Sequence, residues 1–377
     1  MIQTLSRIAI EGIDRYYRDC PEEFHYTVRR NPKGQMKGEG ESIRYAAICQ
    51  IGISRWLKYH PDDATDLPDL YARISGNISR IDDVGDAALW VWAACEGQGF
   101  GLDAFVQRMK HLWPRQVAML HAVELAWVLK ACVRVHDTSV KLREQVLPIL
   151  EEARQRLDAL FHEQSSLFLR HRRAGFGQRL SGAIACFADQ VYPIVALSDA
   201  ADTLGDTRSK EMAERTVSRI CELQGPLGQW LWHYDVPRNR VSEPYPVFSV
   251  HQHGMAPMAL LACDAVTGQD HRAAIEKGLH WIWGRNELNQ DLVLPEEGII
   301  WRDIERREPE KLSRKVKAAC NVMGIRRLGD FLCAPFRGFK VNHECRPYEL
   351  GWILYAWADQ VGWKERDESR EREHSGN

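Results

Sequence analysis

The segment VGDAALWVWAAC, Val84–Cys95, decides the fold because it is apolar on every face when it is wound as an α-helix. A helix that is apolar all round must be buried all round. Five further segments of the same kind recur along the chain. They are residues 43–57, 122–133, 190–201, 253–266 and 347–361. The chain therefore has six candidate inner helices.

A second kind of segment alternates with the first and carries one apolar stripe and one charged face. These candidate outer helices are residues 67–78, 102–113, 143–161, 209–223 and 271–283, and the amphipathic segment Ile2–Asp19 supplies a sixth. Inner and outer helices that alternate at a spacing of roughly 40 residues predict stacked helical hairpins. An open superhelix would expose the apolar inner helices, so we predict an all-α fold, a closed (α/α)6 toroid of six helical hairpins.

Closure of this ring requires Ile2–Asp19 to pack beside Tyr348–Val361. Short β pieces are expected in loops, at residues 167–172, 229–235 and 291–303. We predict a single toroid domain over residues 1–363. The long connection 284–342 is either a lid over one mouth of the ring or a peripheral helix. The tail 364–377 is highly charged without aliphatic residues, which is typical of disorder.

Composition excludes several classes of partner. The net charge is −2, and 45% of the residues are hydrophobic, so nothing favours nucleic acid as a partner. No run approaches the ~18 apolar residues of a membrane span, and the N-terminal segment lacks the apolar core of a signal peptide. The ten cysteines are scattered without a C-x-x-C pair. We therefore expect free thiols and a cytoplasmic location.

The stretch LQGPLGQWLWHYD, Leu223–Asp235, contains Q-x-x-x-G-x-W at Gln224, Gly228 and Trp230. It directly follows a predicted outer helix. We expect Gln224 to bond the free carbonyls at the end of that helix, Gly228 to permit a turn, and Trp230 to stack back on the hairpin. The stretch is first an architectural corner, although Trp230 and Trp232 are also candidate substrate-binding residues.

This motif in an alternating helical pattern resembles the α/α-toroid superfamily. Terpenoid cyclases and protein prenyltransferases belong to it, and their repeated QW motif is matched once here by Gln224, Gly228 and Trp230. The superfamily is also similar in structure to six-hairpin glycosidases, sugar epimerases and polysaccharide lyases. The resemblance implies a toroid whose chemistry takes place at one mouth of the ring.

Polar residues stand at the beginning of every predicted inner helix, where buried polar groups are costly unless they have a purpose. Because all inner helices of a toroid run the same way, these residues should converge on one mouth. The set comprises Arg44, Tyr45, Asp83, Asp86, His121, Glu124, Asp189, Gln190, Tyr192, His251, Gln252, His253, Arg346, Tyr348 and Glu349. Helix capping is the competing explanation for single acids such as Asp83 and Asp189. Arg44 and Arg346 oppose the helix dipole, so capping does not explain them.

We assign roles within this set by chemistry. Asp86, Glu349 and Glu124 are candidate acid/base carboxylates, with His253 as an alternative base. The candidate substrate-binding residues are Arg44, Tyr45, Asp83, Asp189, Gln190, Tyr192, Trp230, Trp232, His251, Arg346 and Tyr348. Their arginines, hydroxyls and aromatic rings suit a sugar or a uronate.

No cofactor is expected. The alternative is zinc held by His251, His253, His343 and Cys345, although no known ligand motif is reproduced. DDATD at 62–66 and DDVGD at 82–86 match the D-D-x-x-D pattern of some terpene synthases. The first follows an inner helix and reads as a solvated turn.

The function that best fits these residues is an enzyme acting on a small-molecule or oligosaccharide substrate, carbohydrate or uronate-containing, by carboxylate and histidine acid–base chemistry. Hydrolase, lyase and epimerase stay open. One alternative is a terpenoid cyclase or prenyltransferase-like enzyme, favoured by the QW match and the 13 tryptophans. The other is a noncatalytic toroid that binds a peptide or a glycan.

Overall fold

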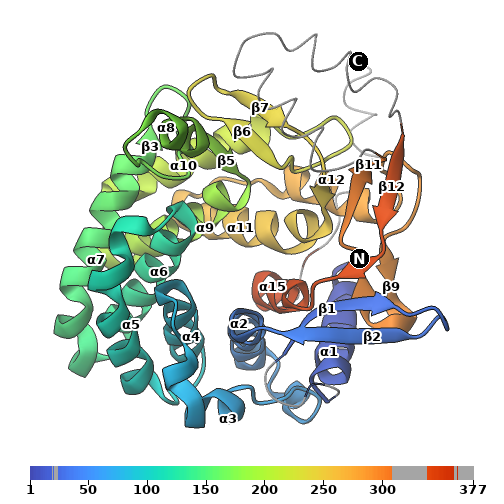
Figure 1. The fold of residues 1–377 in the computed structure, drawn as a ribbon, viewed down its shortest axis with the longest axis horizontal. Helices are drawn as coiled ribbons and strands as arrows, with labels where there is room; N and C mark the ends of the chain where they lie inside the picture. The colour runs from blue at the N-terminus through green and yellow to red at the C-terminus, as the bar shows by residue number, and fades with distance from the viewer. Residues whose placement is uncertain (19, 21–23, 308–337, 361–362, 364–377) are drawn as a thin grey trace.

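The computed structural model describes residues 1–18, 20, 24–307, 338–360 and 363. Within them, six helices form an inner ring (Figure 1). They are α2 (Ile43–Tyr59), α4 (Val84–Glu96), α6 (Ala122–Thr138), α9 (Ala188–Leu204), α11 (Ala256–Thr267) with the π-helical turn His251–Met255 before it, and α15 (Tyr348–Trp357). Each inner helix contacts the next, and α15 contacts α2. The predicted closed toroid is confirmed.

The outer layer consists of α1 (Ile2–Arg18), α5 (Leu102–Gln116), α7 (Val140–Leu160), α10 (Thr207–Glu222) and α12 (Arg272–Ile282). One further outer helix was predicted at residues 67–78, and that prediction is wrong in detail. The chain forms only α3 (Tyr71–Ile74) and a 3-10 segment, Ser75–Arg80, with a kink at Asn77. Gly76 and Asn77 favour turns over a helix interior, so the amphipathic pattern could not continue.

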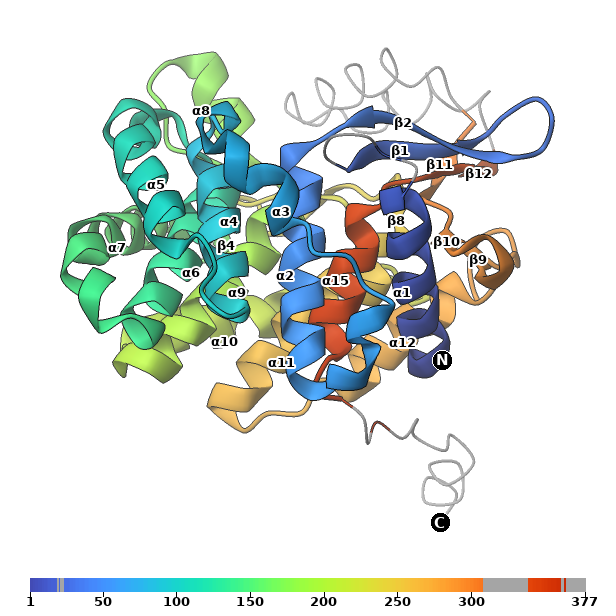
Figure 2. The ribbon, with the colours of Figure 1, turned by 90° about the horizontal axis from the view of Figure 1, so that it is seen from below.

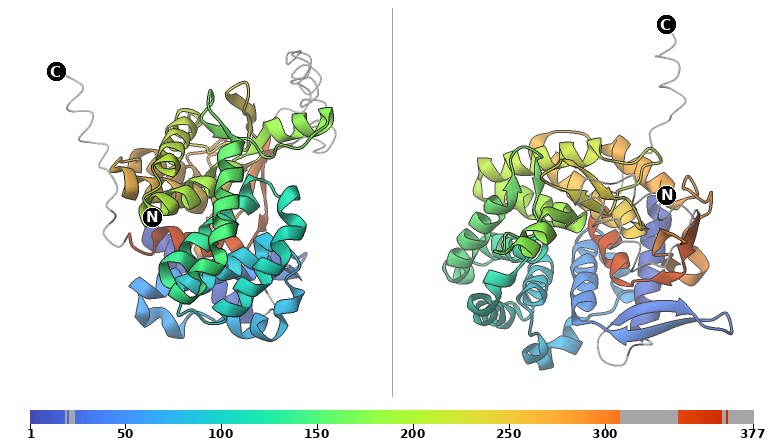
Figure 3. Two further views of the ribbon diagram at one scale, coloured as in Figure 1. Left: turned by 90° about the vertical axis from the view of Figure 1, so that its left-hand side faces the viewer. Right: turned by 45° about the horizontal axis from the view of Figure 1, so that its top comes forward.

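The ring closes where α2 and α15 touch, and two glycines make this contact possible. A Cβ atom at Gly52 would lie 2.1 Å from the carbonyl oxygen of Gly351. A Cβ atom at Gly351 would lie 2.7 Å from Cα of Cys49. Figures 1 and 3 show α2 and α15 side by side with α1 beyond α15. The predicted pairing of the first amphipathic segment with the last inner helix is therefore confirmed.

Small antiparallel sheets lie in the connections. They combine β13 (Glu344–Cys345), β1 (His25–Arg30) and β2 (Met36–Glu41); β10 (Ile299–Ile300) and β9 (Val293–Leu294); β12 (Phe339–Asn342), β11 (Asp303–Arg306) and β8 (Val247–Phe248); β3 (Phe161–His162) and β4 (Leu167–Phe168); and β5 (Ile184–Cys186), β6 (His233–Asp235) and β7 (Arg240–Glu243). The expected β pieces are present. The β1–β2 hairpin was not predicted. The lid or peripheral helix expected in 284–342, and the tail 364–377, fall largely outside the described residues.

The QW motif, residues 224–230, follows the outer helix α10 and is hydrogen-bonded to the outer helix α12. Nε2 of Gln224 donates to the carbonyl oxygens of Gly228 (3.0 Å) and Ala274 (2.9 Å), not to the terminal carbonyls of α10 as we expected. The reason is that α10 ends two residues earlier and the chain turns toward α12. Gly228 has φ +95°, and a Cβ atom there would lie 2.1 Å from the carbonyl oxygen of Lys277. Trp230 is fully buried. The stretch is an architectural corner.

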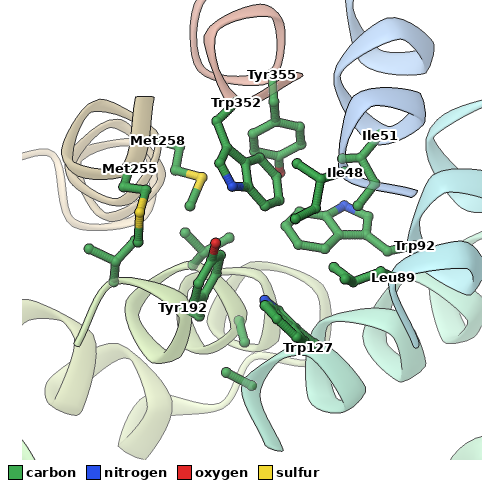
Figure 4. Packing of buried hydrophobic residues seen from close by; sticks show 14 of the residues in the cluster. Ile48, Ile51, Leu89, Trp92, Trp127, Tyr192, Met255, Met258, Trp352 and Tyr355 are labelled. Carbon is green, nitrogen blue, oxygen red and sulfur yellow. The ribbon is translucent and has the colours of Figure 1, made fainter. Parts of the chain in front are cut away.

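The two mouths of the ring differ because the inner helices all begin at one of them. α2 and α15 begin at the end of the ring where β1, β2, β11 and β12 lie, and α8 (Phe176–Ala183) lies at the same end (Figure 2). We call this end the N-terminal mouth and the opposite end the C-terminal mouth. Large side chains from the inner helices fill the centre between them, among them Trp92, Trp127, Tyr192, Trp352 and Tyr355 (Figure 4). No described helix is long and apolar enough to cross a membrane.

Candidate active site

Arg44 and Asp86 form a part-exposed charged pair at the N-terminal mouth. Nε of Arg44 donates to Oδ1 of Asp86 at 2.5 Å, and Nη2 lies 3.3 Å from Oδ1 of Asp83. The guanidinium also lies 5.2 Å from the ring centre of Trp127. The side chain of Arg44 is 35% exposed and that of Asp86 17%. An incoming ligand can therefore reach both members of the pair.

The environment of Asp86 tunes its carboxyl group for proton transfer. Burial raises the pKa of Asp86 to about 6, although the positive charge of Arg44 opposes the increase. This value lies close to neutral pH, where a group can both take up and release a proton.

Three tyrosines form an aromatic surface at the same mouth, and one of them, Tyr45, directly follows Arg44 in α2. Tyr45 stacks on Tyr26 with ring centres 5.1 Å apart, and it contacts Tyr348 at 4.6 Å. Tyr26 is 45% exposed, and the other two rings are half-buried. Arg346 lies 4.0 Å from the Tyr26 ring. Rings stacked in this way offer a flat apolar face with polar edges.

Arginines border the tyrosines. Arg346 pairs with Glu344, and Nη1 of Arg302 lies 3.2 Å from Oε1 of Glu344. The Arg302 side chain is 28% exposed, and its guanidinium lies 5.4 Å from the Phe248 ring. The mouth thus combines aromatic rings with basic groups, which are the groups that contact a sugar ring and a carboxylate.

Glu349 and His253 lie below this surface. Oε2 of Glu349 is 3.6 Å from Nε2 of His253, and only 1% and 0% of the two side chains are exposed. Burial raises the pKa of Glu349 to about 8, while Arg302 and the hydroxyl of Ser249 oppose the change. Burial also lowers the pKa of His253 to about 3. Both groups are uncharged at neutral pH.

The hydroxyl of Ser249 explains how an uncharged Glu349 is accommodated. Its Oγ lies 3.2 Å from Oε2 of Glu349 and 2.9 Å from the carbonyl oxygen of Arg302. A hydroxyl has one proton to donate. With Glu349 protonated, the carboxyl donates to Ser249 and Ser249 donates to Arg302, so both contacts are satisfied.

Several predicted site residues have structural partners. Asp83 caps α4 by accepting from the amides of Gly85 and Asp86, and Glu124 accepts from the amide of His121 at 3.0 Å. Asp189 is 1% exposed and accepts from the amide of Cys186 at 2.8 Å, and burial raises its pKa to about 6. The capping explanation thus accounts for these contacts.

Others hold loops or pack in the core. Gln190 bonds both backbone groups of Phe168, at 2.7 and 3.0 Å. Tyr192 is 5% exposed and packs between Trp127 and Trp352. Trp230 stacks on the buried ring of Phe187.

His251 and Trp232 are the remaining predicted site residues. Nδ1 of His251 lies 3.3 Å from the carbonyl oxygen of Trp230. Trp232 is half-buried, and it stacks on His233 and meets the edge of Phe248.

Within the described residues no group of three or more His, Cys, Asp or Glu side chains could hold a metal ion. His343 contacts Trp301, while Cys345 is buried. The zinc alternative has no assembled ligand set in this part of the chain.

Sequence reasoning missed Tyr26, Trp127, Phe248, Ser249, Arg302 and Glu344 as members of the mouth. Tyr26 and Glu344 lie on the neighbouring strands β1 and β13. The alternating pattern of His25–Arg30 followed by the turn residues Asn31–Gly34 was the available signal for this hairpin. The amide of Ser249 donates a hydrogen bond to the carbonyl oxygen of Arg302 at 2.8 Å. No local sequence pattern predicts this contact between two distant segments.

Solved structures with the same fold cover nearly all of the chain. A sugar epimerase from a ruminal bacterium aligns with a TM-score of 0.65 at 11% identity, over 97% of this chain and 100% of that one. A glycosyl hydrolase family 88 protein from Bacteroides vulgatus aligns with a TM-score of 0.58 at 11% identity, over 96% and 99%. An unsaturated glucuronyl hydrolase responsible for glycosaminoglycan degradation, from Bacillus sp. GL1, also gives 0.58, at 12% identity, over 96% and 97%.

No protein-family model and no curated protein sequence matches the chain. At these identities the structural comparisons establish the fold, and they say nothing of which residues act. The terpenoid-cyclase side of the resemblance has no counterpart among the matches given above. The fold of this chain is the α/α toroid of six-hairpin glycosidases and sugar epimerases.

Proposed function

We propose that the protein is a carbohydrate-active enzyme that binds a uronate-containing sugar at the N-terminal mouth and uses Asp86 as its acid/base group. The observation that carries the proposal is the Arg44–Asp86 pair, which is part-exposed, lies over the ring of Trp127 and shares the N-terminal mouth with Tyr26, Tyr45 and Tyr348. The toroid fold shared with an epimerase and with uronate-acting hydrolases supports it.

Asp86 acts as the general base in this proposal. Arg44 donates to the ionised carboxylate, so the ionised form is the one that is held in position. The apolar face of the sugar lies against the tyrosines, and its carboxylate faces Arg44 and Arg302. Glu349 and His253 cannot touch a substrate at 1% and 0% exposure, so we give proton transfer to Asp86 and a positioning role to the buried pair.

Hydrolysis, elimination and epimerisation all need an acid/base group such as Asp86. Identifying the substrate and its products will decide which of the three reactions takes place. A hydrocarbon substrate is less suitable, because charged groups of this mouth would face an apolar molecule and lose solvent. A cytoplasmic location and the absence of a cofactor belong to the same proposal.

The test is a substrate panel of uronate-containing oligosaccharides, unsaturated uronyl disaccharides, neutral oligosaccharides and free disaccharides, with products identified by mass spectrometry and NMR. We expect turnover of a uronate-containing member and a loss of about 100-fold or more in kcat for Asp86→Asn with an unchanged circular dichroism spectrum. Asp103→Asn makes the same chemical change on the exposed side of α5 and should keep full activity. Full activity of Asp86→Asn would remove Asp86 from the mechanism.

A further inference from the structure

A cavity of about 220 Å³ lies at the C-terminal mouth, at the other end of the ring from Asp86. Its lining residues come from α2, α6, α9, α11 and α15, together with Asp359 and Gln360 beyond the end of α15. One wall is apolar and belongs to α11, where Met258, Leu261 and Val266 line it. The other walls are polar. Figure 4 shows the tryptophans and tyrosines that fill the ring between the two mouths.

The polar wall contains charges that the fold buries deeply. Lys130 is 3% exposed, and its Nζ lies 2.5 Å from Oδ2 of Asp199 and 5.1 Å from the Trp92 ring centre. Glu96 next to it accepts from Lys58 at 3.0 Å and from Nε1 of Trp92 at 3.2 Å. Burial alone would raise the pKa of Glu96, but Lys130, Arg134 and Lys58 lower it to about 2. Buried ion pairs contribute little net stability, so they indicate a purpose other than holding the ring together.

A buried hydroxyl in the cavity has no partner within the described part of the chain. Ser198 is 1% exposed, it lines the cavity, and its Oγ makes no hydrogen bond with any described residue. Buried polar groups are almost always hydrogen-bonded in native proteins. The hydroxyl of Ser198 is therefore available to a hydrogen-bonding group of a molecule bound in the cavity.

The charges around the cavity select the ligand's sign. Asp359 pairs with Arg55 at 3.0 Å and Asp199 with Lys130, whereas Asp202 makes no ion pair with another described residue. The inner helices also end here, and the C-terminal end of a helix carries a partial negative charge. The lining of this cavity thus has one more carboxylate than basic groups, which favours a cation over an anion.

We propose that the C-terminal mouth binds a single amino sugar, a hydroxylated ring that carries a protonated amine. The amine faces Asp202, the ring hydroxyls meet Ser198, Asp199 and Lys130, and the apolar face of the ring lies on the α11 wall. The cavity volume suits one sugar unit. Alternating donors and acceptors beside an apolar wall are the groups that a sugar ring requires.

Isothermal titration of the full chain with glucosamine, glucose and glucuronate tests the proposal. Glucosamine should bind saturably, glucose about fivefold more weakly, and glucuronate not at all. Asp202→Asn should make glucosamine and glucose equal. Ala262→Phe fills the cavity from the half-exposed side of α11 and should abolish binding, while Ala273→Phe on the exposed face of α12 should not.

Binding should persist in Asp86→Asn, so this site stands or falls separately from the proposed function. The proposal is overturned if glucosamine does not saturate, if glucose binds as tightly as glucosamine in the unmodified chain, or if Ala262→Phe leaves binding intact in a protein with the native circular dichroism spectrum.

Discussion

Oε2 of Glu349 and Nε2 of His253 lie 3.6 Å apart in the interior, yet they do not form an ion pair. The pKa of Glu349 is raised to about 8 and that of His253 is lowered to about 3, in each case because burial disfavours the charged form. Two charged partners would have shifted in the opposite directions. The pair is neutral at neutral pH. It lowers the stability of the fold only at a pH that would charge Glu349 or His253.

The pH dependence of stability should report Glu349. Its folded pKa of about 8 lies above the unfolded value. The native state therefore keeps a proton that the unfolded state releases above pH ~4.3, and the stability from this group falls as pH rises toward 8. Glu349→Gln removes that loss. In urea unfolding, the variant should gain stability relative to the wild type by on the order of 1 kcal/mol per pH unit between pH 5 and 8.

Glu151→Gln on the exposed side of α7 is the matched control and should show no such trend. His253 behaves in the opposite way, because its folded pKa of about 3 lies below the unfolded value, so its contribution is lost as pH falls below ~6.5. Glu349→Gln leaves that acid limb in place. A constant difference between Glu349→Gln and wild type across this range would show that Glu349 titrates normally.

Arg44 should set the pH at which Asp86 becomes active. Removing the guanidinium in Arg44→Met takes away the charge that holds the pKa of Asp86 down to about 6. With a substrate from the panel, the acid limb of kcat/KM should lie near pH 6 in the wild type and about one unit higher in Arg44→Met. Arg44→Lys should stay closer to the wild type. An acid limb that does not move would mean that Asp86 is not the titrating base.

Ring closure should depend on Gly52. A methyl group there would meet the carbonyl oxygen of Gly351 at 2.1 Å, so α2 and α15 must separate. We expect Gly52→Ala to lower the free energy of unfolding by about 1–3 kcal/mol, measured by urea titration. Gly76→Ala is the control, since nothing lies within 4 Å of a Cβ atom there. Equal stabilities of the two variants would contradict the close approach of the helices.

The thiols give a fourth test. The eight described cysteines are free, and burial raises the pKa of several, including Cys49, Cys132 and Cys345. Freshly purified protein without reductant should release ten thiols in denaturant and react slowly when native, because the thiolate is the reactive form. Recovery of an intact disulfide would contradict the cytoplasmic location.

The fold was predictable because burial imposes a strong pattern. Six segments such as Val84–Cys95 are apolar on all faces, and only a closed ring covers all of them. The β1–β2 hairpin escaped because its strand His25–Arg30 is short and its partner Met36–Glu41 is almost entirely polar. The prediction of an outer helix at 67–78 was wrong because the spacing of apolar residues carries no information on the turn preference of Gly76 and Asn77.

The candidate site was predictable only in position. The polar residues do gather at the N-terminal mouth, as the common helix direction required. Which of them are free to meet a ligand depends on their backbone partners. Gln190 is engaged by Phe168 of another segment, whereas Glu124 is engaged locally, by the amide of His121 at the start of its own helix. Asp86 stays available because its partner is a side chain, Arg44, that a substrate can approach.

The pairing of α1 with α15 has a consequence for folding during synthesis. The apolar stripe of α1, with Leu5, Ile8 and Ile13 fully buried in the finished protein, emerges from the ribosome long before its partner exists. Contacts between segments so far apart in sequence form late, and they slow folding. Until Tyr348–Trp357 is made, the ring is open and apolar surface stays exposed on α1 and α2. Chaperones bind exposed apolar surface of this kind. Packing of α15 against α1 and α2 therefore covers both of these apolar surfaces.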